Sequence, residues 1–238
     1  MNDACQFHRI LLKLSGESLK GDSATPYSED AVKAIVERVR LILDEGVEVA
    51  IVVGAGNLWR GATRGSGMDR VNADYMGMLG TVMNALNLKE HFRMAGIPAI
   101  VQCSVAMDPI ASRFNREQAM LALDAGQVVI FGGGTGSPFF TTDTTAVLRA
   151  LETDCDAVIK ATKVDGVYSA DPKLDPSAER FAELSFDEAL ARHLKILDST
   201  AFTMCRDNDL PIIVFDFNDP EAFRRVLRGD TEAGTIIS

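Results

Sequence analysis

Short, continuous apolar runs alternate along the chain with longer stretches in which apolar residues recur every three or four positions. The runs predict buried strands at 9–14, 47–53, 97–102, 127–131, 156–160 and 211–215. The periodic stretches predict helices at about 28–45, 74–95, 116–124, 143–152, 186–193, 199–208 and 220–227. Because the strand runs do not alternate with polar residues, both faces of the sheet should be covered. The pattern therefore predicts an α/β fold, a three-layer αβα sandwich around a largely parallel sheet.

The starts and buried faces of two helices can be predicted from their side chains. Ser28 is placed to cap the first long helix, and Asp74 is placed to cap the next one. The buried stripe of that second helix is expected to comprise Leu79, Val82, Met83 and Leu86. The methionine-rich run 76–84 is interpreted as core packing or a subunit interface. No repeat or linker interrupts the pattern, so residues 1–238 are expected to form one domain.

Composition narrows the functional classes. The chain has 238 residues, a formal net charge of −10 and a pI near 4.8. Such a chain lacks the basic surface of a general nucleic-acid binder, although a local group of cations can still hold a small anion. No apolar run approaches the ~20 residues of a membrane span, and the N-terminal segment is not that of a signal peptide, so a cytoplasmic protein is expected. The widely spaced cysteines are predicted to be reduced and mostly buried: Cys5, Cys103, Cys155 and Cys205.

Candidate chemistry follows the predicted strands, because ligands of open α/β sheets bind beyond the carboxyl ends of the strands. Lys13, Ser15 and Gly16 follow the first strand, and GAGN (54–57) with Arg60 follows the second. The stretch FGGGTGSPFFTTDTTA (131–146) ends a third strand, and Lys160, Thr162 and Lys163 end a fourth. Glycine-rich turns combined with three lysines and an arginine are the composition of a polyphosphate site.

The stretch 131–146 contains four glycines but no lysine. These glycines are expected to bring the backbone close to a ligand and to point N–H groups at it: Gly132, Gly133, Gly134 and Gly136. The hydroxyls of Thr141 and Thr142 and a helix N-terminus would add to this cradle. The positive charge must then come from Lys13 and Lys160, oriented by Asp143. Phosphoryl transfer requires mainly positioning and positive charge, which such a group would supply.

Other catalytic patterns are missing. The chain has no Gly-Lys pair and hence no P-loop, and 54–59 reads GAGNLW, which leaves the dinucleotide fingerprint incomplete. The protein-kinase motifs, the nucleophile elbow and the zinc-protease motif are also absent from the sequence. The three histidines, His8, His91 and His193, lie in unrelated segments and are interpreted as surface or packing residues.

Six stretches, in order and over nearly the full length, resemble the bacterial uridylate kinases, which are members of the amino-acid-kinase fold family. They are RILLKLSGE (9–17), GNLWRG (56–61), DYMGMLGTVMN (74–84), TGSPFFTTD (135–143), KATKVDGVYSADP (160–172) and AFTMCRDNDLPIIVF (201–215). The first stretch is shared with other acid kinases of this fold, whereas the fourth and fifth are more particular to uridylate kinases.

The resemblance implies transfer of the γ-phosphate of MgATP to UMP, giving UDP and ADP, as a step in pyrimidine nucleotide biosynthesis. The catalytic residues that it implies are Lys13, Lys160, Asp143 and Asp198. For ATP it implies Lys13, Leu14, Ser15, Gly16, Gly56 and Arg60 near the phosphates, and Thr162, Tyr168 and Asp171 near the adenosine. For UMP it implies Ala55, Asp74, Thr135, Gly136, Ser137, Pro138, Phe139, Phe140, Thr141 and Thr142.

The resemblance also implies a homohexamer that is inhibited by UTP and, in many members, activated by GTP. Mg²⁺ would arrive as MgATP, held mainly by the phosphates rather than by a dedicated protein site.

Two positions depart from the pattern of the uridylate kinases. Ala55 stands where the family usually has glycine, which would strain the loop if that position needs a positive φ. Tyr168 stands where some relatives have Phe, and stacking on a base is possible with either.

Two alternatives remain open at this point. One is a kinase of the same fold that acts on a carboxylate or carbamate, although the extended stretch 135–143 favours a nucleotide acceptor. The other is a nucleotide-binding sensor or storage protein on the same scaffold. That second reading predicts loss of the charged centre, whereas Lys13, Asp143 and Lys160 are all present.

Overall fold

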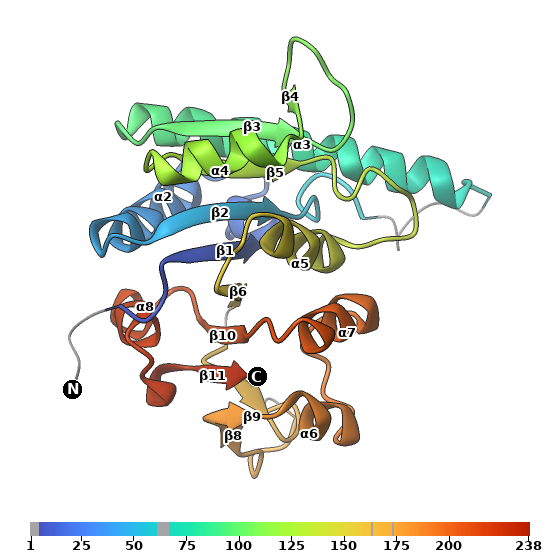
Figure 1. The fold of residues 1–238 in the computed structure, drawn as a ribbon. Helices are drawn as coiled ribbons and strands as arrows, with labels where there is room; N and C mark the ends of the chain where they lie inside the picture. The colour runs from blue at the N-terminus through green and yellow to red at the C-terminus, as the bar shows by residue number, and fades with distance from the viewer. Residues whose placement is uncertain (1–4, 61–66, 163, 173) are drawn as a thin grey trace.

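The central feature of the fold is a mostly parallel sheet. The computed structural model describes residues 5–60, 67–162, 164–172 and 174–238 (Figure 1). Within them a 9-stranded sheet has the order β4-β3-β5-β2-β1-β6-β10-β11-β9. Neighbouring strands run parallel except for β10 and β11. The strands are β1 (Arg9–Leu14), β2 (Glu48–Val53), β3 (Ala99–Cys103), β4 (Ser112–Arg113), β5 (Val128–Gly132), β6 (Ala157–Thr162), β9 (Glu183–Leu184), β10 (Ile212–Asp216) and β11 (Thr235–Ile237).

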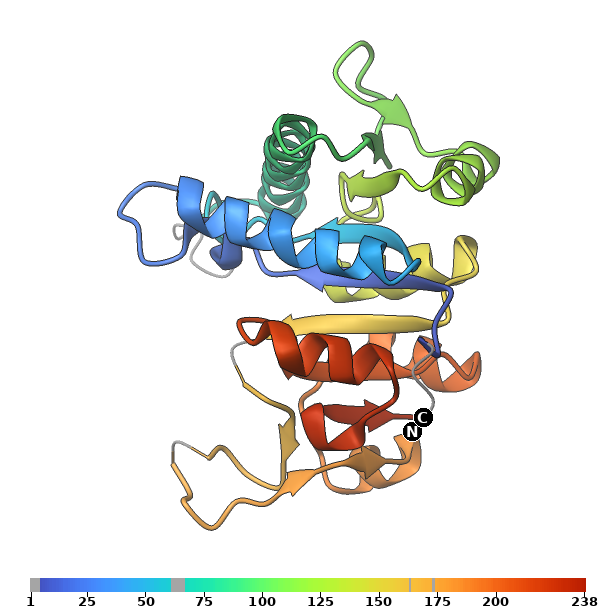
Figure 2. The same ribbon diagram turned by 90° about the vertical axis from the view of Figure 1, so that its left-hand side faces the viewer.

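Helices cover both faces of this sheet (Figure 2). One face carries α2 (Glu29–Asp44), α3 (Arg70–Met94) and α8 (Pro220–Leu227), and the other carries α4 (Arg116–Asp124), α5 (Thr142–Glu152) and α7 (Ser199–Asp207). The buried apolar side chains form two clusters, one on each face. Along β1, Leu12 and Leu14 belong to the first cluster and Leu11 to the second. The predicted three-layer α/β architecture is therefore confirmed.

Helix α2 begins as predicted, but α3 does not. The Ser28 side chain accepts a hydrogen bond from the Ala31 N–H and caps α2. Helix α3 starts one turn earlier than predicted, because the Asp69 side chain accepts from the Asn72 N–H. Asp74 is therefore not the N-cap of α3. Both aspartates precede the apolar pattern, and periodicity alone could not choose between them.

The predicted buried stripe of α3 is wrong at two positions. Leu79 is 52% exposed and Met83 is 54% exposed, whereas Val82 is 3% exposed. The side chains on the buried face of α3 include small and polar ones, among them Gly80, Thr81 and Asn84. In the run 76–84, Met78 and Val82 pack in the core, whereas Met76, Leu79 and Met83 are exposed, so core packing accounts for only part of it.

The shortest elements were not predicted from the sequence. They are α1 (Glu17–Lys20), β7 (Val167–Tyr168), β8 (Arg180–Phe181) and η2 (Thr231–Ala233), together with the edge strands β4, β9 and β11. Segments of two to four residues show no periodicity, which explains the omission. The helix predicted at 186–193 is present as α6 (Phe186–Ala191). In the described ranges, no helix combines the length and apolar character needed to span a bilayer. All four cysteines are free and three are buried, as expected.

Phe215 provides a test of the core on the α8 side of the sheet. Its side chain is 0% exposed and stacks on Phe223 with ring centroids 4.9 Å apart. Phe215→Ala should lower the free energy of unfolding by about 3–5 kcal/mol, because the truncated side chain leaves a cavity. Urea denaturation measures this change. Leu174→Ala, at a side chain that is 83% exposed, is the matched control and should change it by less than about 0.5 kcal/mol. Equal effects of the two substitutions would contradict the described packing.

Candidate active site

Two lysines lie side by side on neighbouring strands at the centre of the sheet. Strands β1 and β6 run parallel, and Lys13 is paired in register with Lys160. Asp143, in the first turn of α5, lies between their ammonium groups. Its Oδ1 is 2.6 Å from Lys13 Nζ, and its Oδ2 is 3.6 Å from Lys160 Nζ. The structure thus brings together the three residues that were predicted to form the charged centre.

The three side chains are largely withdrawn from water. The side chains of Lys13, Asp143 and Lys160 are 13%, 15% and 25% exposed. Burial lowers the pKa of Lys160, the Asp143 carboxylate raises it, and the Lys13 ammonium lowers it, with a net lowering. Lys160 also donates a hydrogen bond to the backbone carbonyl of Ile196. One carboxylate therefore forms ion pairs with two cations, and Asp198 also acts electrostatically on Lys160.

Asp198 supports the start of α5 rather than contacting a lysine. It caps α7 through the Ala201 N–H and accepts hydrogen bonds from the hydroxyls of Thr141 and Thr144. Burial raises the pKa of Asp198, but these hydrogen bonds outweigh burial and lower it overall. Thr141 in turn accepts from the Asp143 N–H at the N-terminus of α5. Asp198 is therefore connected to the charged centre through Thr141, one step further away than the sequence suggested.

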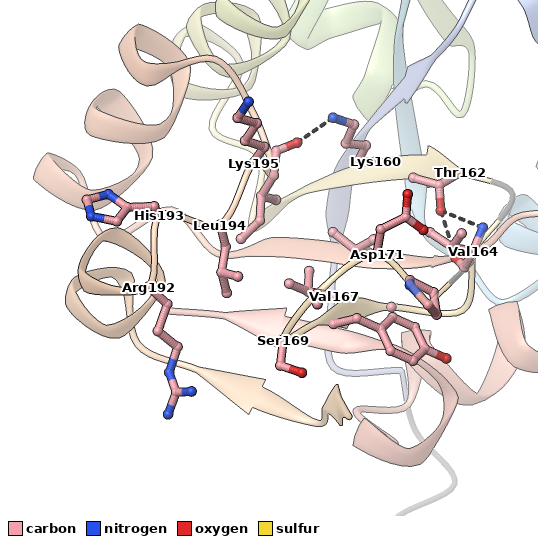
Figure 3. Close-up of a pocket in the computed structure, with 16 residues that line it drawn as sticks. Lys160, Thr162, Val164, Val167, Ser169, Asp171, Arg192, His193, Leu194 and Lys195 are labelled. Carbon is pink, nitrogen blue, oxygen red and sulfur yellow. Dashed lines mark hydrogen bonds between the residues drawn. The ribbon is translucent and has the colours of Figure 1, made fainter. Parts of the chain in front are cut away.

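A large pocket of about 640 Å³ opens beside Lys160 (Figure 3). The predicted adenosine-side residues Thr162, Tyr168 and Asp171 all line it. The Tyr168 hydroxyl donates to Asp165, and this hydrogen bond is the main reason that the pKa of Tyr168 is raised. The Thr162 hydroxyl donates to the Val164 carbonyl and fixes the turn after β6. Lys163 lies outside the described residues.

A small pocket of about 170 Å³ lies on the α3 side of Asp143. It is lined by the following predicted acceptor residues: Ala55, Asp74, Thr135, Phe140, Thr141 and Thr142. Gly136, Ser137, Pro138 and Phe139 belong to the same loop but not to the lining. The Phe139 N–H donates to Asp74 Oδ2 at 2.8 Å, which ties the tip of the loop to α3. Ala55 is not among the residues with positive φ, so the methyl group causes no backbone strain.

The glycine-rich loop after β5 is shaped by packing as well as by any ligand. Gly133 has φ +78°, and a Cβ there would lie 2.7 Å from Cys103 Sγ. The Gly133 N–H donates to Thr81 Oγ1, and the Gly136 N–H donates to the Gly133 carbonyl. The prediction that all four glycines point N–H groups at a ligand is therefore wrong for Gly133 and Gly136, because these two amides already have partners within the protein.

The remaining residues that were predicted to contact the ATP phosphates lie where the loop after β1 meets the loop after β2. A Cβ on Gly16 would lie 2.6 Å from the Gly56 nitrogen, so the backbones of the two loops are in close contact. Arg60 Nη2 donates to Glu17 Oε1 at 2.6 Å. Leu14 is completely buried in the core, so only its backbone could contact a ligand. Ser15 leads into α1 and accepts from the Glu17 N–H at 3.3 Å. Gly61, the last residue of the stretch GNLWRG, lies outside the described residues.

Several lining residues were missed because no motif marks them. Arg192, His193 and Lys195 line the large pocket from the segment after α6. His193 has φ +55°, and it is exposed as expected. Trp59 lines the small pocket and donates from Nε1 to the Ala73 carbonyl at 2.8 Å. One signal could have pointed to Arg192, His193 and Lys195. They lie shortly before Asp198, the N-cap of α7, and helix N-termini favour anions.

The sequence model of the amino acid kinase family matches residues 8–216, so the chain belongs to this family. Within it, the chain is similar to the UMP kinase of Bacillus anthracis, with 36% identity, a TM-score of 0.94 and coverage of 98% of this chain and 96% of that one. It is also similar to the UMP kinase of Ureaplasma parvum (34%, TM-score 0.91, 97% and 98% covered). The uridylate kinase of Archaeoglobus fulgidus is less similar (28%, TM-score 0.72, 96% and 99%). The resemblance seen in the sequence is thereby confirmed.

The charge balance of the site can be tested on Lys160. Because the Asp143 carboxylate raises the pKa of Lys160 while burial and Lys13 lower it, Asp143→Asn should lower this pKa further. Lys160 would then lose its proton at a lower pH than in the unchanged protein. NMR titration of side-chain-labelled lysine measures the shift. Asp154→Asn, which removes a surface carboxylate paired with Arg116, is the control and should leave the titration of Lys160 unchanged. An unchanged or raised pKa in Asp143→Asn would contradict the described geometry.

The close contact between the loops gives a second test. At Gly16 a Cβ would lie 2.6 Å from Asn57 Oδ1 and 2.7 Å from the Gly54 carbonyl, whereas at Gly54 its nearest neighbour is 3.4 Å away. Gly16→Ala should lower the free energy of unfolding by about 1–3 kcal/mol, since backbone must move to admit the methyl group. Gly54→Ala should have the smaller effect in the same urea titration. The reverse order of the two effects would be incompatible with this packing.

Proposed function

We propose that this chain is an ATP-dependent UMP kinase, which transfers the γ-phosphoryl group of MgATP to UMP and gives UDP and ADP in pyrimidine nucleotide biosynthesis. The observation that carries the proposal is the position of the charged centre between two pockets. Lys160 lines the large pocket, and Asp143 directly follows Thr142 in the wall of the small one. The family and the names of the similar solved structures support UMP as the acceptor.

In this proposal the large pocket holds the donor. Tyr168 offers an aromatic face to the adenine, and Thr162 and Asp171 offer polar groups to the adenosine. The phosphates extend past Lys160 toward Lys13, Gly16 and the backbone of 54–56. Arg60 reaches the phosphates by leaving its ion pair with Glu17 and binding a phosphate group instead. This exchange is favourable because a polyphosphate carries more negative charge than one carboxylate.

The small pocket then holds the acceptor. A carboxylate only accepts hydrogen bonds, so Asp74, which is held by Arg70 and the Phe139 N–H, suits the ribose hydroxyls of UMP better than its phosphate. The UMP phosphate is therefore directed toward Thr141, Thr142 and the N-terminus of α5. At that end of the pocket, an acceptor oxygen faces the donor across the two lysines.

The chemistry requires no general base, because the attacking phosphate oxygen of UMP is already ionised. A bond forms between that oxygen and the γ-phosphorus, and the bond from the γ-phosphorus to the bridging oxygen breaks. The electron pair stays on the β-phosphate of ADP. Lys13 and Lys160 stabilise the negative charge on the transferring and leaving oxygens, and Asp143 holds both ammonium groups in place.

We propose that Mg²⁺ enters with ATP and is held mainly by phosphate oxygens. In the described part of the chain, no three or more His, Cys, Asp and Glu side chains converge as metal ligands. The carboxylate nearest the centre, Asp143, is engaged by two lysines. Mg²⁺ in kinases commonly relies on substrate phosphates and few protein ligands, which fits this arrangement. When bound, it would neutralise charge on the β- and γ-phosphates.

The proposal extends to a single domain that assembles as a cytoplasmic homohexamer, with UTP as an inhibitor and GTP as an activator. These points rest on the resemblance to uridylate kinases. The apolar side chains Tyr75, Leu79 and Met83, which are exposed on α3, support assembly but do not define the number of subunits. No observation favours a sensor or storage role, since the charged centre is complete.

The proposal is tested by ADP formation in a coupled assay with MgATP and a panel of acceptors. UMP should support turnover, whereas AMP, acetylglutamate, aspartate and carbamate should not, and CMP and dUMP define the strictness of the site. Lys13→Ala should lower kcat by roughly 10²–10³-fold, as expected when one transition-state charge partner is removed. Lys89→Ala, on the exposed side of α3, is the matched control and should stay within twofold.

Two results would overturn the proposal. The first is a folded protein that binds ATP but phosphorylates none of the acceptors, which would make the sensor or storage role the better reading. The second is a carboxylate or carbamate as the preferred acceptor.

A further inference from the structure

We propose that Thr81 and Asn84 are positioning residues, which hold the two glycine loops of the site at a fixed spacing from one shared helix. The first loop comprises residues 54–57 after β2, and the second comprises residues 132–136 after β5. The catalytic consequence rests on the proposed UMP kinase activity, whereas the structural support of the loops can be measured without it.

Asn84 supports the first loop. It lies in the middle of α3 and is 0% exposed. Its Nδ2 donates to the Gly54 carbonyl at 2.7 Å and to Asn57 Oδ1 at 2.8 Å. Asn57 Nδ2 also lies 2.9 Å from the Pro26 carbonyl, which links the loop to the segment before α2. Asn84 therefore holds both ends of this loop.

Thr81 supports the second loop in a similar way. It is 3% exposed, and its hydroxyl donates to the Met78 carbonyl within α3 at 2.7 Å. This bond orients the oxygen so that it accepts the Gly133 N–H at 2.8 Å. The next residues of the loop, Gly134 and Thr135, line the small pocket, and Thr81 itself is part of the same lining. The Thr81 hydroxyl thus links the start of this loop to α3, as the Phe139 N–H bond to Asp74 does nearer its tip.

The hydrogen bonds to the two loops explain why Thr81 and Asn84, rather than apolar residues, occupy the buried face of α3. Residues three apart lie on the same side of a helix, so both side chains point from one rigid element. Buried polar groups are costly unless hydrogen-bonded, and apolar side chains would pack this face at lower cost. Gly80 directly precedes Thr81 on this helix, and a Cβ there would lie 2.9 Å from the Ala55 Cβ. The helix is therefore held very close to the first loop.

The spacing matters because α3 also carries Asp74, which lines the small pocket. One helix thereby fixes the acceptor wall and both glycine loops relative to one another. A displacement of about 1 Å in a catalytic site can cost up to 100-fold in rate. Loss of either support should therefore lower catalysis more than it lowers stability.

The test compares four variants: Thr81→Val, Thr81→Ser, Asn84→Ala and Asn87→Ala. Thr81→Val removes the hydroxyl at nearly constant shape, and Thr81→Ser retains it. Asn87→Ala is the control, because its Oδ1 has no hydrogen-bond partner and it lies one turn further along α3. Steady-state kinetics, melting temperature and amide hydrogen exchange are measured for each.

Thr81→Val should raise KM for UMP by about 10-fold with KM for ATP within twofold, since the loop that it supports lines the small pocket. Thr81→Ser should restore KM for UMP to within threefold of the unchanged protein. Asn84→Ala should lower kcat by about 10-fold or more. Hydrogen exchange should accelerate in the peptide containing Gly133 for Thr81→Val, and in the peptide 54–60 for Asn84→Ala. Asn87→Ala should change none of these.

The proposal is overturned if exchange in both loops is unchanged, or if Asn87→Ala acts as strongly as the others. It is also overturned if Thr81→Ser fails to rescue Thr81→Val. If Asn84→Ala does not fold, the two Thr81 variants decide the question. If the unchanged protein does not phosphorylate UMP, the proposed function fails, and the exchange measurements still decide whether α3 supports the loops.

Discussion

The site depends on one electrostatic constraint, the placement of two lysines in register on neighbouring parallel strands. Adjacent strands lie only about 4.8 Å apart, so two ammonium groups on the same face of β1 and β6 repel each other. Asp143 relieves this repulsion by lying between them at the N-terminus of α5. Much of the surrounding structure serves to hold that carboxylate: Thr141 caps the helix, and Asp198 binds Thr141 and Thr144. The result is a centre in which two ammonium groups share one ion-paired carboxylate, an arrangement that suits an anionic ligand.

The fold makes this centre accessible from two directions. Because the carboxyl ends of β1, β2, β5 and β6 meet at one edge of the sheet, the loops that follow them surround the lysines. The segment after β6 forms the large pocket, and the loop after β5 forms the small pocket together with α3. Two separate pockets around one charged centre suit the transfer of a group between two ligands better than the storage of one.

Much of this arrangement could be predicted from the sequence. Continuous apolar runs identified the strands of the central sheet, and a lysine at the end of two such runs is unusual enough to mark the site. The wrong predictions concern residues whose burial or hydrogen bonding depends on partners that are distant in the sequence. Leu79 and Met83 look like core residues, but Thr81 and Asn84 occupy the buried face because they bond to distant loops. No local pattern encodes such a bond, and for the same reason the Gly133 amide was wrongly assigned to a ligand.

The role of the two lysines is tested most directly by a crystal structure with UMP, ADP, Mg²⁺ and aluminium fluoride, which mimics the phosphoryl group in flight. The proposed arrangement predicts that the fluoride complex lies between the two pockets, with Lys13 Nζ and Lys160 Nζ each within about 3 Å of it. It also predicts that Asp143 remains between the two ammonium groups. A complex in which the phosphoryl mimic binds away from both lysines would contradict the account.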